Sequence, residues 1–412
     1  MLHHPPVAIC AMMLSAVLSA QVLQPPFAGT YTFTDLGAVP GVPTSYGGVT
    51  FKEGNPNKLL IGGAANNPTG AIYEVDVMRD GQGYITGFAG TATQLATAAR
   101  IDGGLCYGPG GVLFFTTYSN NTLGQIRPGS TSPDRVIQLL GHGVSSSTGT
   151  CNFVPPNFPG AGQLKVASYG DGLIYSFAVT PDGSGTYDLT ALAGTIQVSG
   201  NPEGLLYVPP GSALIPDYQY VLIAEYSTGV IALYRVDAAG NPLPASRLPF
   251  LTGLGGAEGA CTDPVTGDLV FSTFGAGSRV IRITGFGVCG SHENYGNGIA
   301  GSNGEPTISG GGCAGRGQVT SIDVANGRPN TSGLLAVGFI RSQIPVLNGS
   351  LLVNIVNSFF HTLDSAGQWN LTLQLPTDPV WNGLEIYSQS WYLDPAAAFG
   401  ISATGGLHTL VR

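Results

Sequence analysis

The chain has 412 residues, of which 9% are charged, and its formal net charge is −9. Long surface helices need charged solvent-facing sides and nucleic-acid binders need clustered basic residues, so this composition excludes both a mainly helical protein and a nucleic-acid partner. The 63 glycines and 29 prolines, with 43% hydrophobic residues, instead predict a folded, turn-rich, all-β protein.

The N-terminal segment resembles an export signal. Residues 7–20 form an apolar run that is too short to span a bilayer, and it ends in the small residues Ser19 and Ala20. We therefore expect residues 1–20 to be a signal peptide and the mature chain to be secreted, with no transmembrane segment. The alternatives are a buried strand or a misassigned start.

A repeat of roughly 50 residues organises positions 28–288, and such repeats of four short strands are typical of β-propeller blades. Segment 30–37, TYTFTDLG, is predicted to be the outer strand that closes the last blade. Five copies predict a five-bladed propeller, and a six-bladed ring with one degenerate blade is the alternative. Each copy begins near a glycine, at Gly48, Gly104, Gly149, Gly204 and Gly259.

The repeat resembles propellers of the NHL and gluconolactonase-like type. The resemblance is carried by Pro202–Leu205, Ala257–Ala260 and the turn segment Asp263–Leu269. It implies a propeller fold, and it does not by itself imply an activity, because propellers host many unrelated functions.

Residues 289–412 differ from the repeat and predict a C-terminal β-sandwich of short alternating strands. This part resembles a module found on secreted proteins of planctomycete-type bacteria, through its YGxG opening at Tyr295, the run Leu373–Gln389 and the ending Trp391–Leu407. The resemblance implies an extracellular appended module for surface retention or assembly at a bacterial cell envelope, and it implies no catalysis. Cys289 and Cys313 bracket its start and are the predicted disulfide.

Three carboxylates stand out in a chain so poor in charge. Asp102, Glu203 and Glu258 lie one or two residues before the repeat glycine in three copies, and this position predicts that they cluster at one mouth of the central channel. Converging carboxylates favour a divalent cation, and Ca²⁺ prefers such oxygen ligands. Asn201 could add another oxygen. The resemblance places a Glu- and Asn-ligated metal at that mouth. The alternative is that the carboxylates only accept hydrogen bonds from turn amides.

Three further cysteines, Cys106, Cys151 and Cys261, each lie two residues after a repeat glycine. Side chains in the same phase point the same way in every blade, so we expect these thiols to be small buried apolar groups that do not meet. A Cys106–Cys151 disulfide is the alternative.

The favoured function is an extracellular binding or scaffolding platform, with an unidentified glycan or protein ligand and a channel-mouth Ca²⁺. One alternative is a metal-dependent hydrolase or lactonase that uses Asp102, Glu203 and Glu258. The other is a glycan-processing enzyme that uses the same carboxylates, although the repeat region contains no tryptophan platform for a sugar. Whether the chain is an enzyme is left open, and a non-catalytic role is preferred.

Overall fold

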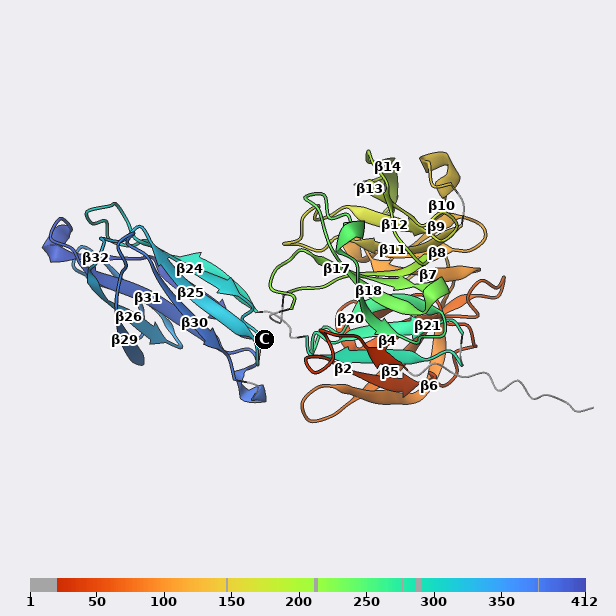
Figure 1. Cartoon of the computed structure of the whole chain (residues 1–412), viewed down its shortest axis with the longest axis horizontal. Helices are drawn as coiled ribbons and strands as arrows, with labels where there is room; N and C mark the ends of the chain where they lie inside the picture. The colour runs from red at the N-terminus through yellow and green to blue at the C-terminus, as the bar shows by residue number, and fades with distance from the viewer. Residues whose placement is uncertain (1–20, 146, 211–213, 276, 287–289, 377) are drawn as a thin grey trace, which may run out of the picture.

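The computed structural model describes residues 21–145, 147–210, 214–275, 277–286, 290–376 and 378–412. The predicted signal peptide, residues 1–20, lies outside these residues. The chain is all-β, as predicted, and Figure 1 shows two groups of sheets side by side: strands β2–β22 on one side and β23–β33 on the other. No helix in the described part of the chain is long and apolar enough to cross a membrane.

Five antiparallel sheets make up the first group of described strands, and each has its four main strands in the order of the repeat. We number them sheets 1 to 5 along the chain. Sheets 1 and 2 contain, respectively, β3 (Val49–Lys52), β4 (Asn55–Gly63), β5 (Ala71–Arg79) and β6 (Ile85–Thr97), and β7 (Ile101–Tyr107), β8 (Leu113–Thr117), β9 (Thr122–Ile126) and β10 (Arg135–Gln138). Sheet 3 contains β11 (Thr148–Phe153), β12 (Leu164–Ser168), β13 (Leu173–Pro181) and β14 (Tyr187–Ala191), with β15 (Ile196–Gln197). Sheets 4 and 5 contain, respectively, β16 (Pro202–Tyr207), β17 (Tyr220–Glu225), β18 (Val230–Arg235) and β19 (Leu248–Thr252), with β1 (Val22–Leu23), and β20 (Ala257–Thr262), β21 (Leu269–Thr273), β22 (Val280–Thr284) and β2 (Thr32–Gly37).

The first strands of the five sheets form a closed ring. In chain order β3, β7, β11, β16 and β20 each contact the next, and β20 contacts β3. As predicted, the segment before the first repeat is the outer strand of sheet 5, because β2 pairs with β22. Each space between neighbouring sheets holds its own cluster of buried apolar side chains. Neighbours in the ring therefore bury the apolar faces that a single sheet would expose.

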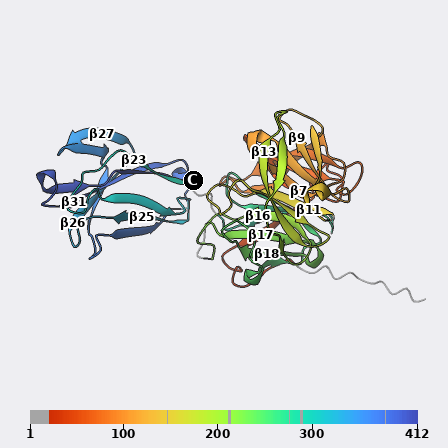
Figure 2. The same ribbon diagram turned by 90° about the horizontal axis from the view of Figure 1, so that it is seen from above.

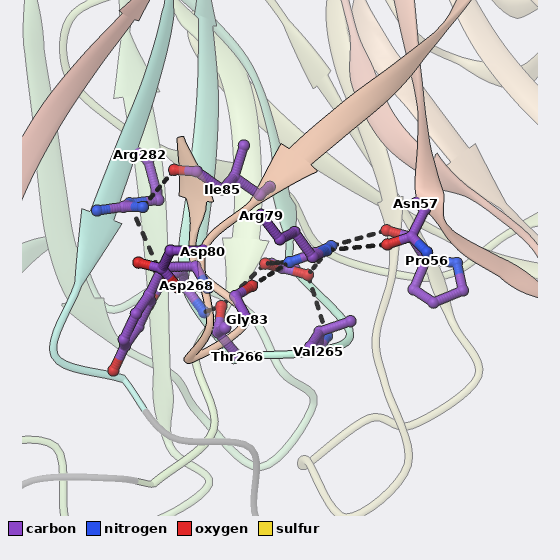
Figure 3. Close-up of polar contacts among 12 residues, drawn as sticks. Pro56, Asn57, Arg79, Asp80, Gly83, Ile85, Val265, Thr266, Asp268 and Arg282 are labelled. Carbon is purple, nitrogen blue, oxygen red and sulfur yellow. Dashed lines mark hydrogen bonds and ion pairs between the residues drawn. The ribbon is translucent and has the colours of Figure 1, made fainter. Parts of the chain in front are cut away.

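The contact between the last and the first sheet carries a buried ion pair (Figure 3). Asp263 is fully buried, and its carboxylate accepts hydrogen bonds from both terminal nitrogens of Arg79, at 2.6 and 2.8 Å. The same carboxylate accepts the Val265 amide and the Thr266 hydroxyl, as expected of a turn residue. The turn was predictable from the sequence, but the bond between sheets 5 and 1 was not.

Asp268 ends the same hairpin and is also buried, with Arg282 Nε 3.5 Å from one carboxylate oxygen. The Arg282 guanidinium donates to the carbonyl of Ile85 and packs on the ring of Tyr84, so it is shared among several partners. Burial raises the pKa of Asp268 to about 7, although the charge of Arg282 opposes the shift.

This pKa predicts that the folding stability falls as the pH rises. The folded-state pKa of Asp268 lies above the unfolded value, so its protonation stabilises the folded state. This contribution to the unfolding free energy is fully present below about pH 4 and is lost as the pH passes through 7. We expect Asp268→Asn to reduce the loss of unfolding free energy between pH 5 and pH 8 by on the order of 1–3 kcal/mol. Urea denaturation at both pH values measures the unfolding free energy. Asp188→Asn, at an exposed carboxylate, should keep the wild-type pH dependence of the unfolding free energy. The prediction would be contradicted if this free energy changed equally between pH 5 and pH 8 in both variants.

The remaining strands form two facing sheets and a hairpin, consistent with the predicted sandwich (Figure 2). A cluster of buried side chains from both sheets fills part of the space between them, including Ile308, Val324, Leu335 and Leu407. The larger sheet contains β23 (Ser291–Tyr295), β33 (Gly406–Leu410), β31 (Glu385–Leu393), β26 (Ser332–Gly338), β29 (Asn357–Thr362) and β32 (Ile401–Ala403); the smaller has β24 (Thr307–Gly312), β25 (Val319–Ala325) and β30 (Trp369–Gln374); the hairpin is β27 (Arg341–Val346) with β28 (Gly349–Val353).

The predicted disulfide cannot be placed, because Cys289 lies outside the described residues. Its expected partner, Cys313, is buried directly after β24. The pairing therefore stays a prediction.

Candidate functional site: a buried carboxylate cluster in the channel

The first strand of a sheet leaves its regular pairing where the carboxylates occur. The register between first and second strands shifts between Ile101 and Leu105, between Pro202 and Gly204, and between Ala257 and Ala260. Such bulges turn a side chain out of the alternation of a strand. Each of the three carboxylates lies inside one of these irregular stretches, which allows it to point towards the ring centre.

The structure brings Asp102, Glu203 and Glu258 together, as the sequence predicted. One carboxylate oxygen of each lies within 4.8 Å of the others, and the residues are 1%, 3% and 1% exposed. Both carboxylate oxygens of Asp102 and Glu258, and one of Glu203, are buried without a hydrogen-bond partner. The main chain at Gly103 still lowers the pKa values of Asp102 and Glu203, so turn amides contribute to the cluster, but they leave these five oxygens without a well-formed hydrogen bond.

Burial dominates the electrostatics of the cluster. Loss of water raises the pKa values of all three carboxyl groups well above their ordinary range. The negative charge of Asp102 raises the pKa values of Glu203 and Glu258 further. Three anions at this distance repel one another in a low-dielectric site, and either protons or a cation must compensate their charge.

Close packing of backbone explains why the carboxylates converge. A Cβ atom on Gly103 would lie 1.9 Å from the carbonyl oxygen of Glu203, and one on Gly204 would lie 2.2 Å from that of Glu258. Both distances are far below van der Waals contact, so only glycine lets the first strands approach so closely. Gly103 and the repeat glycine Gly204 therefore allow the first strands to lie close together at the ring centre.

The two asparagines near the cluster differ in what they can offer. Asn201, predicted as a ligand, donates its side-chain amide to the carbonyl of Tyr169, and its own main-chain carbonyl accepts the Tyr226 amide. Asn66 was not predicted. Its Oδ1 is buried without a partner, and its side chain lowers the pKa of Asp102 against the effect of burial. Asn66 lies outside the glycine-centred motif, in the turn that follows β4, so the repeat alignment gave no signal for it.

Four aromatic side chains form a collar beside the cluster. Each directly follows the second strand of its sheet, and neighbouring rings meet edge to face with centroids 5.8–6.0 Å apart. Burial raises the pKa values of two of them, Tyr169 and Tyr226, and the nearby carboxylates raise these values further. In sheet 1 the equivalent position is Ala64, so sheet 1 adds no ring to the collar. The collar residues are Tyr118, Tyr169, Tyr226 and Phe274.

The opposite end of the first strands opens into a cavity of about 590 Å³. Its lining includes Thr50, Cys106, Asn152, Leu206 and Cys261, one from each of the five sheets. The exposed carboxylate of Glu53 also lies on this cavity, which makes it a useful comparison for the carboxylates at the other end.

The prediction that Cys106 and Cys151 do not meet was wrong. Their Sγ atoms lie 3.9 Å apart in the buried cluster between sheets 2 and 3, and the structure shows both as free thiols. Cys106 pairs with Phe114 on β8, whereas Cys151 pairs with Val166 on β12. Counted from the collar residue that follows each of these second strands, Tyr118 or Tyr169, the partner of Cys151 is one residue nearer than the partner of Cys106. A shift of one residue moves a side chain to the other face of a sheet, so the two thiols face each other.

Comparison with known proteins finds no matching family model and no matching curated protein. Solved structures with a similar fold include a glutaminyl cyclase from Myxococcus xanthus, at 13% identity and a TM-score of 0.37 over 62% of this chain and 96% of that one. Virginiamycin B lyase from Staphylococcus aureus matches at 12% identity and a TM-score of 0.33, over 62% of this chain and 99% of that one. A PQQ-bound aldose sugar dehydrogenase from Streptomyces coelicolor matches at 15% identity and a TM-score of 0.34, over 60% of this chain and 83% of that one. These similarities concern the β-propeller fold and do not extend to activity.

Proposed function

We propose that the propeller binds one divalent cation, Ca²⁺ by its ligand chemistry, between Asp102, Glu203 and Glu258. The observation that carries this proposal is that five carboxylate oxygens of these residues are buried without a hydrogen-bond partner. Hard oxygen donors of this kind suit Ca²⁺, which accepts carboxylates, side-chain amides and carbonyls in an irregular shell. The buried Oδ1 of Asn66 is a further oxygen ligand for a cation in the same region.

Within this proposal the propeller acts as an extracellular binding platform rather than as an enzyme. A catalytic metal keeps an open position for water or substrate. The carboxylates here are at most 3% exposed and lie beside the aromatic collar, which favours a structural cation over a lactonase or hydrolase centre. The same burial disfavours the glycan-processing alternative, because a general acid and base must reach the glycosidic bond.

Metal analysis of the purified full chain tests the cation site. We expect one Ca²⁺ per chain, and a melting temperature that falls by several degrees in chelator because a ligand that binds only the folded state stabilises it. Glu203→Gln should weaken Ca²⁺ binding at least tenfold and make the melting temperature insensitive to chelator. Glu53→Gln removes the same charge at the opposite cavity and should behave as wild type.

Two outcomes would overturn parts of the proposal. Metal-free protein with no response to chelator or added Ca²⁺ would show that the carboxyl groups are simply protonated in the fold. Metal-dependent hydrolysis of a simple lactone, lost in Glu203→Gln and kept in Glu53→Gln, would show that the site is catalytic.

A further inference from the structure

The core of the C-terminal sandwich is interrupted by a cavity of about 390 Å³. Two separate clusters of apolar side chains flank it, one around Leu335 and Tyr392 and the other around Leu375 and Val411. Side chains on the cavity wall come from both clusters, so the cavity lies between the two halves of the core. The walls are formed by both sheets, with Ile322 and Leu371 on the smaller and Leu335, Val337 and Ile386 on the larger.

The lining is apolar and carries no formal charge. None of the described residues that line the cavity is Asp, Glu, Lys or Arg. Its histidine, His292, is held between the hydroxyl groups of Thr409 and Thr320, at 3.0 and 3.1 Å, and burial lowers its pKa. Aliphatic, phenylalanine and tryptophan side chains cover most of the remaining wall.

One polar group in the cavity wall has no partner. Ser388 on β31 is 1% exposed, and its Oγ is buried without a hydrogen bond. A buried hydroxyl without a partner is energetically unfavourable, so it is rare unless a ligand or water satisfies it. This hydroxyl is independent of the apolar shape of the cavity and points to an occupant with one hydrogen-bonding group.

The entrance is also built from apolar side chains. Phe339 and Phe359 line the cavity and are 48% and 47% exposed. Phe359 lies on β29, the edge strand of the larger sheet, and the next residue, Phe360, is 86% exposed and does not line the cavity. Two half-exposed phenylalanines at the mouth give an apolar ligand a path from solvent to the interior.

We propose that this cavity is a binding site for a small, neutral, mainly apolar molecule whose single hydrogen-bonding group contacts Ser388. The volume lies within the range of small-molecule sites, and an apolar lining with few polar groups is typical of them. The proposed function of the propeller does not enter this argument, so the two proposals can fail separately.

Titration of the full chain with 1-aminoanthracene tests the site. This probe is neutral, apolar and flat, carries one amine, and fluoresces more strongly in a dry environment. We expect saturable binding of one probe per chain, and displacement by 1-octanol. Phe359→Asp places a charge at the entrance and should weaken binding at least tenfold. The neighbouring Phe360→Asp introduces the same charge outside the cavity and should change binding less than twofold.

Ser388→Ala tests the hydrogen bond separately, and we expect two- to tenfold weaker binding of the amine probe. Anthracene, which lacks the amine, should bind wild type and Ser388→Ala equally. Melting temperatures of the variants identify any that fail to fold.

Three results would overturn the proposal. The first is an absence of saturable probe binding to the folded chain. The second is equal weakening by the two phenylalanine variants, which would indicate a general apolar surface. The third is binding that depends on protein concentration and is lost in Phe360→Asp, which would indicate self-association through β29.

Discussion

Replacing Gly103 by alanine is expected to destabilise the propeller by ~3 kcal/mol or more, because overpacking of this kind forces backbone to move. The new Cβ would lie 1.9 Å from the carbonyl oxygen of Glu203 on another strand of the ring. Since β7 and β16 must then separate, the affinity for the proposed Ca²⁺ should fall together with stability. Chemical denaturation and calcium titration of the same protein measure both effects.

Gly141 provides the matched control for this substitution. It belongs to the same repeat, and a Cβ there meets nothing within 4 Å. Gly141→Ala should leave stability and calcium affinity close to wild type. If Gly103→Ala were equally mild, the first strands could not be as closely packed as the structure shows.

Removing the Asp263 carboxylate is expected to have the second large effect. Asp263→Ala leaves Arg79, which is only 12% exposed, without its charged partner at the contact between sheets 5 and 1. Loss of one member of a buried ion pair costs about 3–5 kcal/mol. The contact closes the ring, so we expect a lower unfolding midpoint in urea and earlier proteolysis at this contact.

Asp76→Ala is the control, because it removes the carboxylate of an exposed pair with Lys58 and should cost at most about 1 kcal/mol. A double variant, Arg79→Met with Asp263→Leu, removes both charges and should recover part of the lost stability. If the two single variants Asp263→Ala and Asp76→Ala were equally stable, the buried pair would not contribute to ring closure.

The repeat was readable because a propeller blade is a local unit. Strands that are neighbours in the chain are neighbours in the sheet, so spacing and apolar pattern predict each sheet, and the pairing of β2 with β22 followed from a missing fourth strand in the last copy. The charge-poor composition also made Asp102, Glu203 and Glu258 conspicuous. Their convergence followed from their shared place near the repeat glycines.

What the repeat could not show were differences of one residue between copies and contacts between sheets. The offset of Cys151 relative to Cys106 depends on where the bulge in each first strand falls. The link from Arg79 to Asp263 joins positions 184 apart in the chain. Asn66 is near Asp102 because sheets 1 and 2 pack together, with the Asn66 amide donating to the carbonyl of Ile101, and no spacing within one copy indicates it.

The sequence was therefore sufficient for the all-β class, the repeat, the closing strand and the three carboxylates, since each depends on local pattern and composition. The tertiary structure decided that these carboxylates are buried with five oxygens lacking a well-formed hydrogen bond, that four aromatic rings meet beside them, and that a cavity divides the sandwich core beside Ser388. These features arise from the way separate sheets pack against each other. Packing of that kind depends on side chains far apart in the chain, so it leaves no periodic signal in the sequence.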